Sequence, residues 1–212
     1  MGTNFELKRI NYVPQFLYKD KGDKKYYIGS KIENFILKKQ LNDDKYANIN
    51  LIQSRITKKL YIMKEIKPSQ INSIKNIIQL LEKLYHNNIM SYYISFGKKK
   101  PFYLVNEYIK NNYNNNINKS LLDLNEEIKE KNQQYINEKV IWEYLIQSLS
   151  GLLYLHENKI YIRDIRPENL LIDENENLKI SNFELCAIKS ENEDDFKTDI
   201  YRLGSAFFFY NV

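Results

Sequence analysis

The stretch that decides the fold reads YIRDIRPENLLID and spans residues 161–173. It places Asp164 five residues before Asn169, with Arg166 between them. Transfer of a phosphoryl group needs a carboxylate to orient the attacking hydroxyl, oxygen ligands for Mg²⁺ and a cation on the phosphates. Asp164 suits the first need, Asn169 suits the second as a neutral ligand, and Arg166 can touch the transferred phosphate. The spacing therefore favours a loop that holds a base and a metal ion beside a phosphate.

A second metal ligand is expected shortly after this loop, but the sequence has an amide there. Residues 180–185 read ISNFEL, and Asn182 stands where such a site needs an acidic ligand. An amide supplies a carbonyl oxygen without negative charge, whereas hard cations prefer carboxylates. The metal site is therefore expected to be weak or unoccupied. Glu184 can restore a carboxylate only with a different turn geometry, which is the less favoured alternative.

The residues before this loop divide into short β-rich segments and one helix. Lys64 lies in one of these segments, where it can serve as the phosphate cation, although an isolated lysine is usually a solvated surface charge. Apolar residues recur at helical spacing over 71–86 and predict an amphipathic helix. Runs rich in β-forming residues predict five strands, at 26–29, 32–37, 59–66, 90–96 and 102–108.

The later residues are expected to be mainly helical. Residues 137–158 are periodic and apolar on one side, which predicts a helix. The polar run NNYNNNINK at 111–119 cannot bury a core face, so it is interpreted as a surface insertion. The acidic stretch 191–199 precedes a segment, 200–212, that starts as a helix. Short strands are predicted at 159–162, 169–173 and 177–181.

Composition limits the classes of function. A chain of 212 residues, 43% of them apolar, suffices for one domain or two small lobes with a core. The net charge of +5 is spread over short clusters without a basic stripe among aromatic residues, so no nucleic-acid partner is expected. No run is long enough to span a membrane. The single cysteine, Cys186, excludes an intramolecular disulfide and indicates a reducing, cytoplasmic location.

Together these motifs resemble the eukaryotic protein kinase family. Residues 154–185 are similar to the catalytic loop and the metal-binding turn after it, because Arg163-Asp164 matches the H-R-D motif and residues 167–169 match its P-E-N continuation. The resemblance implies an α+β, bilobal fold with a small β-rich N-lobe, which carries one helix, and an incomplete, mostly helical C-lobe. It divides the chain into an N-terminal extension at 1–20, an N-lobe and hinge at 21–109 and a partial C-lobe at 110–212.

The resemblance also implies roles for individual residues. LVNEYI at 104–109 is similar to the hinge between the lobes, with Asn106 at the gatekeeper position and Glu107 and Ile109 at nucleotide-binding positions. Asp199 matches the residue that anchors the catalytic loop. A continuous apolar column that links the lobes is expected from four residues, Leu81, Tyr92, Ile162 and Phe183.

Several chemical positions of the family differ in this sequence. The nucleotide-covering loop, assigned to IGSKIENFI at 28–36, keeps only Gly29 of three expected glycines. Ile77 stands where the helix should supply a glutamate to pair with Lys64, and the nearest acid, Glu82, lies well round the helix from that face. The D-F-G motif reads Asn-Phe-Glu at 182–184.

Two features of the final third suggest interactions. The chain ends within the helix that starts near Asp199, and an exposed AFFFY segment predicts that a partner protein covers residues 203–212. Arg163 can pair with the acidic run 191–195 in place of a phosphorylated loop, but a solvated acidic loop is the favoured interpretation.

The favoured function is that of a pseudokinase-like, protein-binding scaffold that needs no cofactor. The alternative is a serine/threonine kinase that binds ATP and Mg²⁺ and acts through Asp164 and Asn169. Nucleotide binding without transfer is the intermediate case.

Overall fold

The computed structural model describes most of the chain, and its contacts divide the chain into two compact units. The first unit consists of Met1–Lys75 and Tyr92–Tyr108, and the second of Asn76–Ser91 and Ile109–Val212. Residues 76–91 thus group with the second unit, whereas the predicted lobe boundary lies near residue 109. The described residues are 18–19, 25–26, 29, 31–43, 47–71, 74, 77, 81, 84–97, 101–110, 119–131, 136–183, 188–189 and 193–208.

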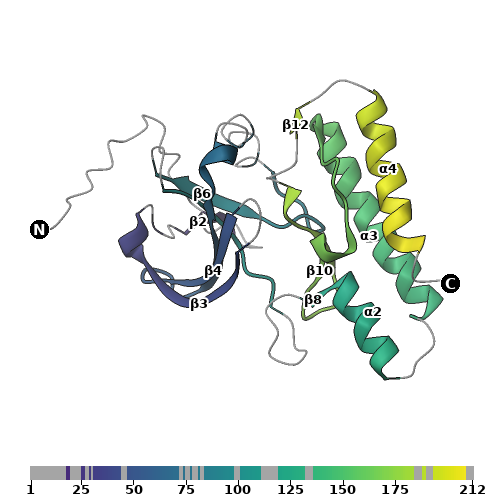
Figure 1. The fold of residues 1–212 in the computed structure, drawn as a ribbon, viewed down its shortest axis with the longest axis horizontal. Helices are drawn as coiled ribbons and strands as arrows, with labels where there is room; N and C mark the ends of the chain where they lie inside the picture. Colours follow the sequence, from purple (N-terminus) through teal and green to yellow (C-terminus); the bar gives the residue numbers. More distant parts are fainter. Residues whose placement is uncertain are drawn as a thin grey trace, which may run out of the picture. The chain divides into compact units, whose positions relative to one another are not determined.

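The first unit is built on a five-stranded antiparallel sheet (Figure 1). The strands follow the order β3-β4-β5-β7-β6, and each pairs with its neighbours in antiparallel register. One face of the sheet is covered by a cluster that includes Ile52, Met63 and Val105. The strand bounds are β3 Phe35–Asp43, β4 Ala47–Ser54, β5 Leu60–Ile66, β6 Tyr92–Phe96 and β7 Phe102–Glu107.

Strand β4 was not predicted from the sequence, and the strand predicted over 32–37 begins too early. The segment ANINLIQS at 47–54 alternates polar and apolar residues imperfectly, so its strand character comes from pairing with β3 on one side and β5 on the other. Residues Ile32–Asn34 form a 3₁₀ turn, η1, before β3. Two short strands, β1 Tyr18–Lys19 and β2 Lys25–Tyr26, pair with each other in a separate sheet.

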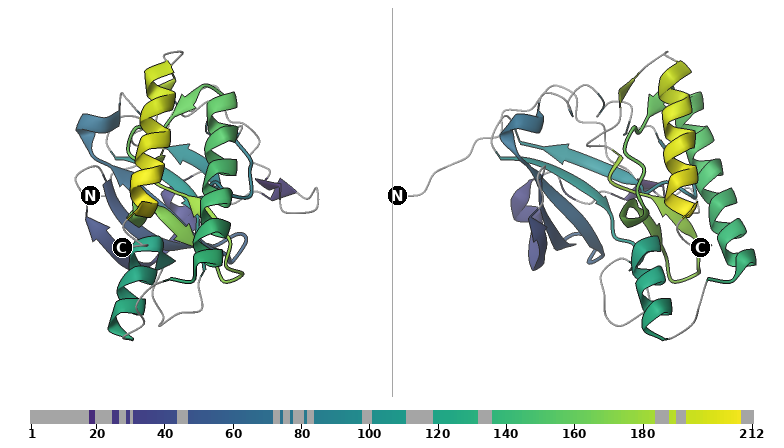
Figure 2. Two further views of the ribbon diagram at one scale, coloured as in Figure 1. Left: turned by 90° about the vertical axis from the view of Figure 1, so that its right-hand side faces the viewer. Right: turned by 45° about the vertical axis from the view of Figure 1, so that its right-hand side comes forward.

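Among the described residues, the second unit includes the helices α2 Leu121–Glu130, α3 Glu138–Glu157 and α4 Glu193–Phe208. Helix α2, which was not predicted, begins with a reciprocal cap, because the Ser120 hydroxyl accepts from the Asp123 N–H and the Asp123 carboxylate accepts from the Ser120 N–H. Helix α3 confirms the helix predicted over 137–158 and packs against α4, and Figure 2 shows the two side by side.

Short strands connect these helices. β10 Leu170–Ile172 pairs with β11 Leu178–Ile180 and with β8 Lys119–Ser120, while β9 Ile160–Tyr161 pairs with β12 Ile188–Lys189. Asn88 joins this region to α3, since its side-chain amide donates to Gln147 Oε1 at 3.1 Å and to the Leu178 carbonyl at 2.9 Å. Gly151 permits this approach, because a Cβ there would lie 2.7 Å from the Asn88 carbonyl oxygen.

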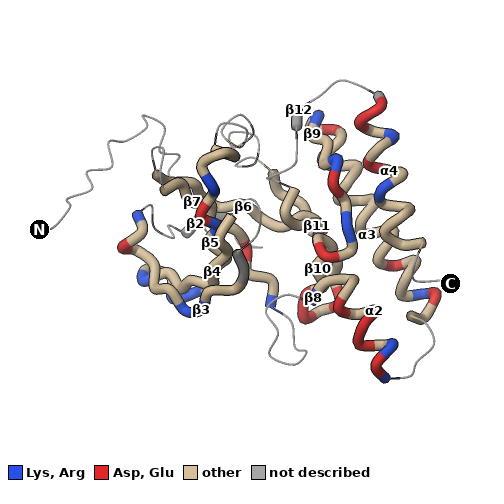
Figure 3. The backbone as a smooth tube through the Cα atoms, viewed as in Figure 1, with Lys and Arg blue, Asp and Glu red and all other residues tan. Residues whose placement is uncertain are grey.

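Helix α4 starts earlier than predicted, inside the acidic stretch. Figure 3 shows acidic residues in its first turns, where the positive end of the helix dipole favours negative charge. Asp195 and Asp199, one helical turn apart, are both buried. Farther along, Ala206 and Phe207 are buried and Phe208 is exposed, while residues 209–212 lie outside the described part.

Among the described residues, no helix combines the length and the apolar character that crossing a membrane requires.

Candidate functional site

Asp199 of α4 holds the start of the loop 161–173. Its Oδ1 accepts from the Arg163 N–H at 2.6 Å, and its Oδ2 accepts from the Ile162 N–H at 2.9 Å. The same Oδ2 lies 2.8 Å from His156 Nε2 on α3. Asp199 is completely buried, so these hydrogen bonds replace the water that its carboxylate would otherwise bind. The loop is thereby fixed to both packed helices.

His156 is a site residue that the sequence patterns did not identify. It is buried on the inner side of α3, and its ring contacts Tyr161 and Phe196 at centroid separations of 4.8 and 5.0 Å. The helical periodicity could have indicated His156, because a polar residue on the buried face of an apolar helix needs a polar partner.

Arg163 pairs with Asp195, so the interpretation of the acidic run as a solvated loop was wrong. Arg163 Nε and Nη2 lie 2.7 and 2.6 Å from Asp195 Oδ1, and the Asp195 side chain is only 7% exposed. The acidic residue can reach the arginine because it lies on the inner face of α4 and not in a loop. Arg163 has φ 61°, a left-handed conformation that is unfavourable for a residue with a Cβ.

Asp164, the candidate base, lies between two arginines. Its Oδ1 accepts from Arg166 Nε at 2.7 Å and lies 3.9 Å from Arg202 Nη1. The carboxylate remains 22% exposed. Arg202, on α4, was not identified from the sequence because it has no counterpart in the motifs considered.

The two candidate metal ligands bind each other. Asn182 Nδ2 donates to Asn169 Oδ1 at 2.8 Å, and Asn182 has φ 58°. The backbone is joined as well, since the Asn169 carbonyl accepts from the Ser181 N–H at 2.8 Å and from its hydroxyl at 2.9 Å. Three hydrogen bonds therefore hold the left-handed turn at residue 182 against Asn169.

These residues do not fit a magnesium ion. Asn169 Oδ1, the oxygen that would bind the metal ion, accepts a hydrogen bond from Asn182 Nδ2. The amide N–H directed towards this oxygen carries partial positive charge. A cation in that position needs negative oxygen ligands. Within the described ranges there is no cluster of three or more His, Cys, Asp or Glu side chains that can hold a metal ion. Glu184, the alternative ligand, lies outside these ranges.

The candidate nucleotide residues of the first unit lie on its sheet. Lys64 on β5 is 2% exposed and pairs in register with Ile49 of β4 and Leu104 of β7. Asn106 is buried on β7, and Glu107 ends that strand. In the second unit, Ile109 is buried with Met90 and Leu171, and Ile77 is helical and buried, so no carboxylate occupies that helix position. Glu82 is outside the described part.

The assignment of the nucleotide-covering loop to residues 28–36 was wrong, because strand β4 had been missed. The turn between the first two strands of the sheet joins Asp43 to Ala47. If Ile49 takes the valine position, the pattern G-x-G-x-x-G-x-V places Asn42, Asp44 and Ala47 at its three glycines. That connection therefore contains no glycine.

Gly29 has a conformational role instead. Its φ is +115°, and a Cβ there would lie 2.5 Å from Asn34 Cβ. Asn34 Oδ1 in turn accepts from the Lys31 N–H at 3.1 Å, which closes the η1 turn. Arg55 holds the turn against the sheet through its N–H, which donates to the Asn34 carbonyl, and through Nε, which donates to the Glu33 carbonyl.

The four residues of the expected apolar column are all buried. Leu81, Ile162 and Phe183 belong to the second unit and are 0 to 2% exposed, while Tyr92 is buried in the first unit. The continuity of the column across both units stays a prediction.

The family model of the protein kinase domain matches residues 35–204. The match begins after Gly29, in agreement with a nucleotide-covering turn between β3 and β4. CBL-interacting protein kinase 26 of Oryza sativa subsp. japonica is 27% identical over 170 residues, which are 77% of this chain and 32% of the relative.

Two further relatives have similar coverage. CBL-interacting serine/threonine-protein kinase 10 of Arabidopsis thaliana is 32% identical over 62% of this chain and 25% of its own length. CBL-interacting protein kinase 14 of the same rice subspecies is 30% identical over 70% of this chain and 31% of its own length. The chain thus spans between a quarter and a third of these curated relatives.

Proposed function

The chain belongs to the protein kinase domain family, and from this membership we propose that it acts as a pseudokinase-like scaffold that binds a partner protein without transferring phosphate. The observation that carries the proposal is the hydrogen bond from Asn182 to Asn169. It joins two groups that a phosphotransferase directs at a metal ion, and it presents an N–H where negative charge is needed.

The nucleotide side of the site supports the same proposal. A backbone approaches phosphates closely where side chains are absent, and the β3–β4 connection has Asn, Asp and Ala at the three glycine positions. Asp43 and Asp44 also place negative charge there. Two independent losses, at the metal ligand and at the phosphate-covering turn, both reduce affinity for ATP with Mg²⁺.

The loop architecture is nevertheless retained. Asp199 holds two backbone N–H groups, Arg163 pairs with Asp195, and Arg163 and Asn182 both adopt the left-handed conformation. Non-glycine residues in this conformation cost about 1 kcal/mol or more each. A strained loop that is held in shape without a metal ligand is consistent with a surface used for binding.

The proposed partner surface lies on α3 and α4 and is defined here as the α3–α4 apolar surface. Trp142, Ile146, Leu149 and Leu153 of α3 are spaced four, three and four residues apart, and each is at least 41% exposed. This spacing forms one stripe along a helix, of the kind that packs against another helix. On the neighbouring α4, Phe196 and Ile200 are exposed, as are Tyr201 and Phe208.

The partner is proposed to contribute an amphipathic helix, laid along the α3 stripe and beside residues 203–208. Exposed large apolar groups in one patch mark binding surfaces. Glu138, Glu143 and Glu157 flank the stripe and outnumber Lys139, which lies 3.8 Å from Glu143, so basic residues on the partner helix are favoured. In the described part of 203–212, Phe208 is the exposed large apolar residue.

A thermal-shift measurement tests the loss of catalysis. ATP with Mg²⁺ or Mn²⁺ should leave the unfolding temperature unchanged, and radiolabelled ATP should label neither the protein nor a generic substrate. A metal-dependent shift together with labelling that Asp164→Asn abolishes would overturn the proposal.

A second experiment tests the partner surface. A photo-crosslinking residue at position 146 should capture a protein whose purified form then shifts the fluorescence of Trp142, the single tryptophan, to shorter wavelength. Ile146→Glu should abolish binding, whereas Ile56→Glu, the same change at an exposed isoleucine of the first unit, should retain it. Equal binding by both variants would contradict the α3–α4 apolar surface.

The alternative function is an active serine/threonine kinase. It is favoured by the retention of Asp164 and Asn169 and by relatives whose names describe protein kinases. Under this alternative the Asp164 carboxylate accepts a substrate hydroxyl, and the same labelling assay decides between the two functions.

A further inference from the structure

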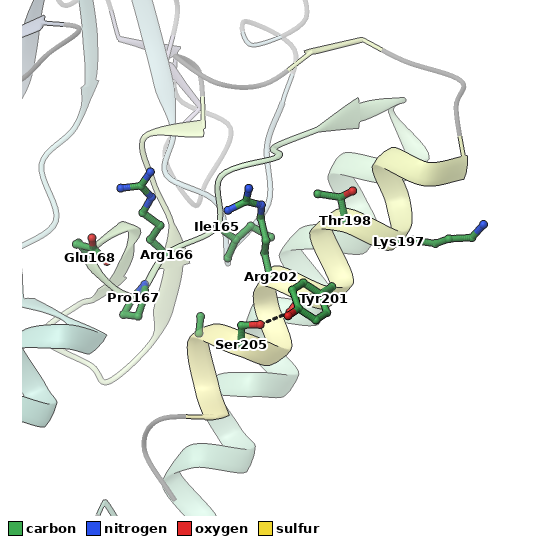
Figure 4. Close-up of a pocket in the computed structure, with 10 residues that line it drawn as sticks. Ile165, Arg166, Pro167, Glu168, Lys197, Thr198, Tyr201, Arg202 and Ser205 are labelled. Carbon is green, nitrogen blue, oxygen red and sulfur yellow. Dashed lines mark hydrogen bonds between the residues drawn. The ribbon is translucent and has the colours of Figure 1, made fainter. Parts of the chain in front are cut away.

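The first unit presents an exposed surface on which apolar side chains project among basic ones. Its apolar residues are Ile32 of the η1 turn, Leu37 of β3 and Ile56 of the turn between β4 and β5, which are 44, 62 and 46% exposed. These three residues and the basic residues around them, all within 31–60, are called the η1–β3 surface. The pocket of about 680 Å³ in Figure 4 is a different feature, since residues of the second unit line it.

Hydrogen bonds hold the segments of the η1–β3 surface side by side. The Arg55 N–H donates to the Asn34 carbonyl at 2.8 Å, and Arg55 Nε donates to the Glu33 carbonyl at 3.1 Å, so the β4–β5 turn is joined to η1. Strand β3 follows η1 directly, and Leu37 pairs in register with Ile52 of β4. The three apolar side chains therefore project from backbone that the sheet holds in place.

Positive charge surrounds these apolar side chains, and Figure 3 shows part of it along β3. Within residues 31–41 and 53–60 there are six basic residues and one acid, Glu33, which lies 3.7 Å from Lys31. In the part of the chain that the structure describes, no ion pair is formed by Lys38, Lys39 or Lys58. The six basic residues, all exposed, are Lys31, Lys38, Lys39, Arg55, Lys58 and Lys59. Such a surface attracts a negatively charged partner.

The outer position of β3 does not by itself explain this surface. An extended peptide can add to an outer strand by strand pairing, but two register shifts in β3 and the lysines at 38 and 39 oppose such an addition. Protection of the strand edge therefore accounts for Lys38 and Lys39. It does not account for Ile32 and Ile56, because these exposed apolar residues lie on turns beyond the ends of the strands.

We propose that the η1–β3 surface binds the anionic surface of a phospholipid membrane. Ile32, Leu37 and Ile56 enter the layer of lipid headgroups, where apolar side chains gain free energy without needing a groove. The lysines around them lie beside the negative headgroups, whose attraction for basic residues acts within about a Debye length. Binding of this kind lies at the membrane surface and requires no membrane-spanning helix.

This inference goes beyond the proposed function. It uses neither the nucleotide and metal residues nor the α3–α4 apolar surface. Failure of the vesicle experiment therefore leaves the thermal-shift and crosslinking results unaffected, and failure of those experiments leaves the η1–β3 surface unaffected.

Co-sedimentation of the full chain with vesicles tests the proposal. Vesicles of equal parts phosphatidylcholine and phosphatidylserine should bind the chain about tenfold or more tightly than vesicles of phosphatidylcholine alone. Binding should weaken as salt is raised, because salt screens the attraction between exposed charges.

One pair of variants tests the charges. Lys38→Glu combined with Lys39→Glu should weaken binding to the phosphatidylserine vesicles about tenfold or more. Lys139→Glu combined with Lys197→Glu makes the same change in net charge at exposed positions of the second unit and should bind as the parent chain does.

A second pair tests the apolar side chains. Leu37→Ser should weaken binding about fivefold or more, because the leucine side chain no longer enters the headgroup layer. Leu153→Ser, the same change at a leucine of similar exposure on α3, should leave binding unchanged. Circular dichroism melting curves establish that each variant is folded, and all substituted side chains are exposed in the parent chain.

Three results would overturn the inference. They are equal sedimentation with both kinds of vesicle, equal losses in the η1–β3 variants and their controls, and release from the vesicles by polyglutamate at the same concentration of negative charge. The last result would mean that the surface binds an acidic polypeptide by charge alone.

Discussion

Asn182 Nδ2 donates a hydrogen bond to Asn169 Oδ1 over 2.8 Å, and this bond joins the two positions that the resemblance assigns to metal ligands. The hydrogen bond depends on the amide at position 182. A carboxylate at 182 has no N–H to donate, so it would meet Asn169 either through a shared cation or through the amide N–H of Asn169 itself. The amide therefore holds the turn locally through its own hydrogen bond.

Asn182→Asp should restore affinity for a divalent cation. The change replaces the donated N–H by a negative oxygen beside Asn169, so Mn²⁺ should raise the unfolding temperature of the variant and not that of the parent chain. With the ion at about ten times its dissociation constant, the expected stabilisation is about 1.4 kcal/mol. Differential scanning fluorimetry with and without Mn²⁺ measures it.

Asn137→Asp is the matched control for this change. It adds the same charge at the N-cap of α3, where aspartate caps as well as asparagine. An equal metal-dependent shift in both variants would show that added charge, and not the 169–182 pair, is responsible.

Asp199→Asn should destabilise the second unit strongly. The carboxylate is completely buried and holds two backbone N–H groups and His156, so its replacement forces at least one N–H of an amide against a donor. Loss of a buried, charge-assisted network costs about 3 kcal/mol, measured by urea denaturation.

Asp194→Asn, five residues earlier on the same helix, provides the comparison. Its side chain is 78% exposed and lies 3.4 Å from Lys197, and exposed pairs contribute about 0.5 kcal/mol or less. Similar losses for both variants would mean that Asp199 does not brace the loop.

Arg163 and Asp195 should be energetically coupled. In a double-mutant cycle with Arg163→Ala and Asp195→Ala, we expect a coupling free energy of about 1 kcal/mol, limited because the arginine side chain is 48% exposed. Urea denaturation of the four chains provides the values. Additive losses would indicate that the two side chains act independently.

Stability should fall as pH decreases through the histidine range. Burial lowers the pKa of His86, and its Nδ1 accepts from the Asn88 N–H at 3.1 Å, which requires an unprotonated nitrogen. The unfolded chain, with an ordinary pKa of about 6.5, takes up the proton first. The contribution is therefore fully present above that value and is lost as pH falls below it.

Denaturation midpoints across this pH range measure the effect, and NMR titration of the ring resonances measures the pKa directly. His86→Gln should flatten the pH dependence. A His86 resonance that titrates at or above the ordinary value would contradict the prediction.

The nucleotide-covering turn shows why part of the site could not be predicted. A nucleotide-covering loop is predicted from its glycines. Because Gly29 lies in a region with few glycines, the sequence predicts the loop around Gly29. The real turn between β3 and β4 contains no glycine to reveal it. Only the pairing of β4 with β3 and β5 identifies that turn, because strand pairing joins residues that local propensity does not.

By itself the sequence determined the family, the order of its motifs and the identity of the changed chemical groups, including the amide at Asn182 and the apolar residue at Ile77. These follow from residue types at short, regular spacings. The tertiary structure alone decided which distant groups meet. Asp195 reaches Arg163, and Arg202 approaches Asp164, because α4 begins within the acidic stretch and packs beside α3. The helical register places these side chains inwards, and contacts across such separations depend on packing that no local pattern specifies.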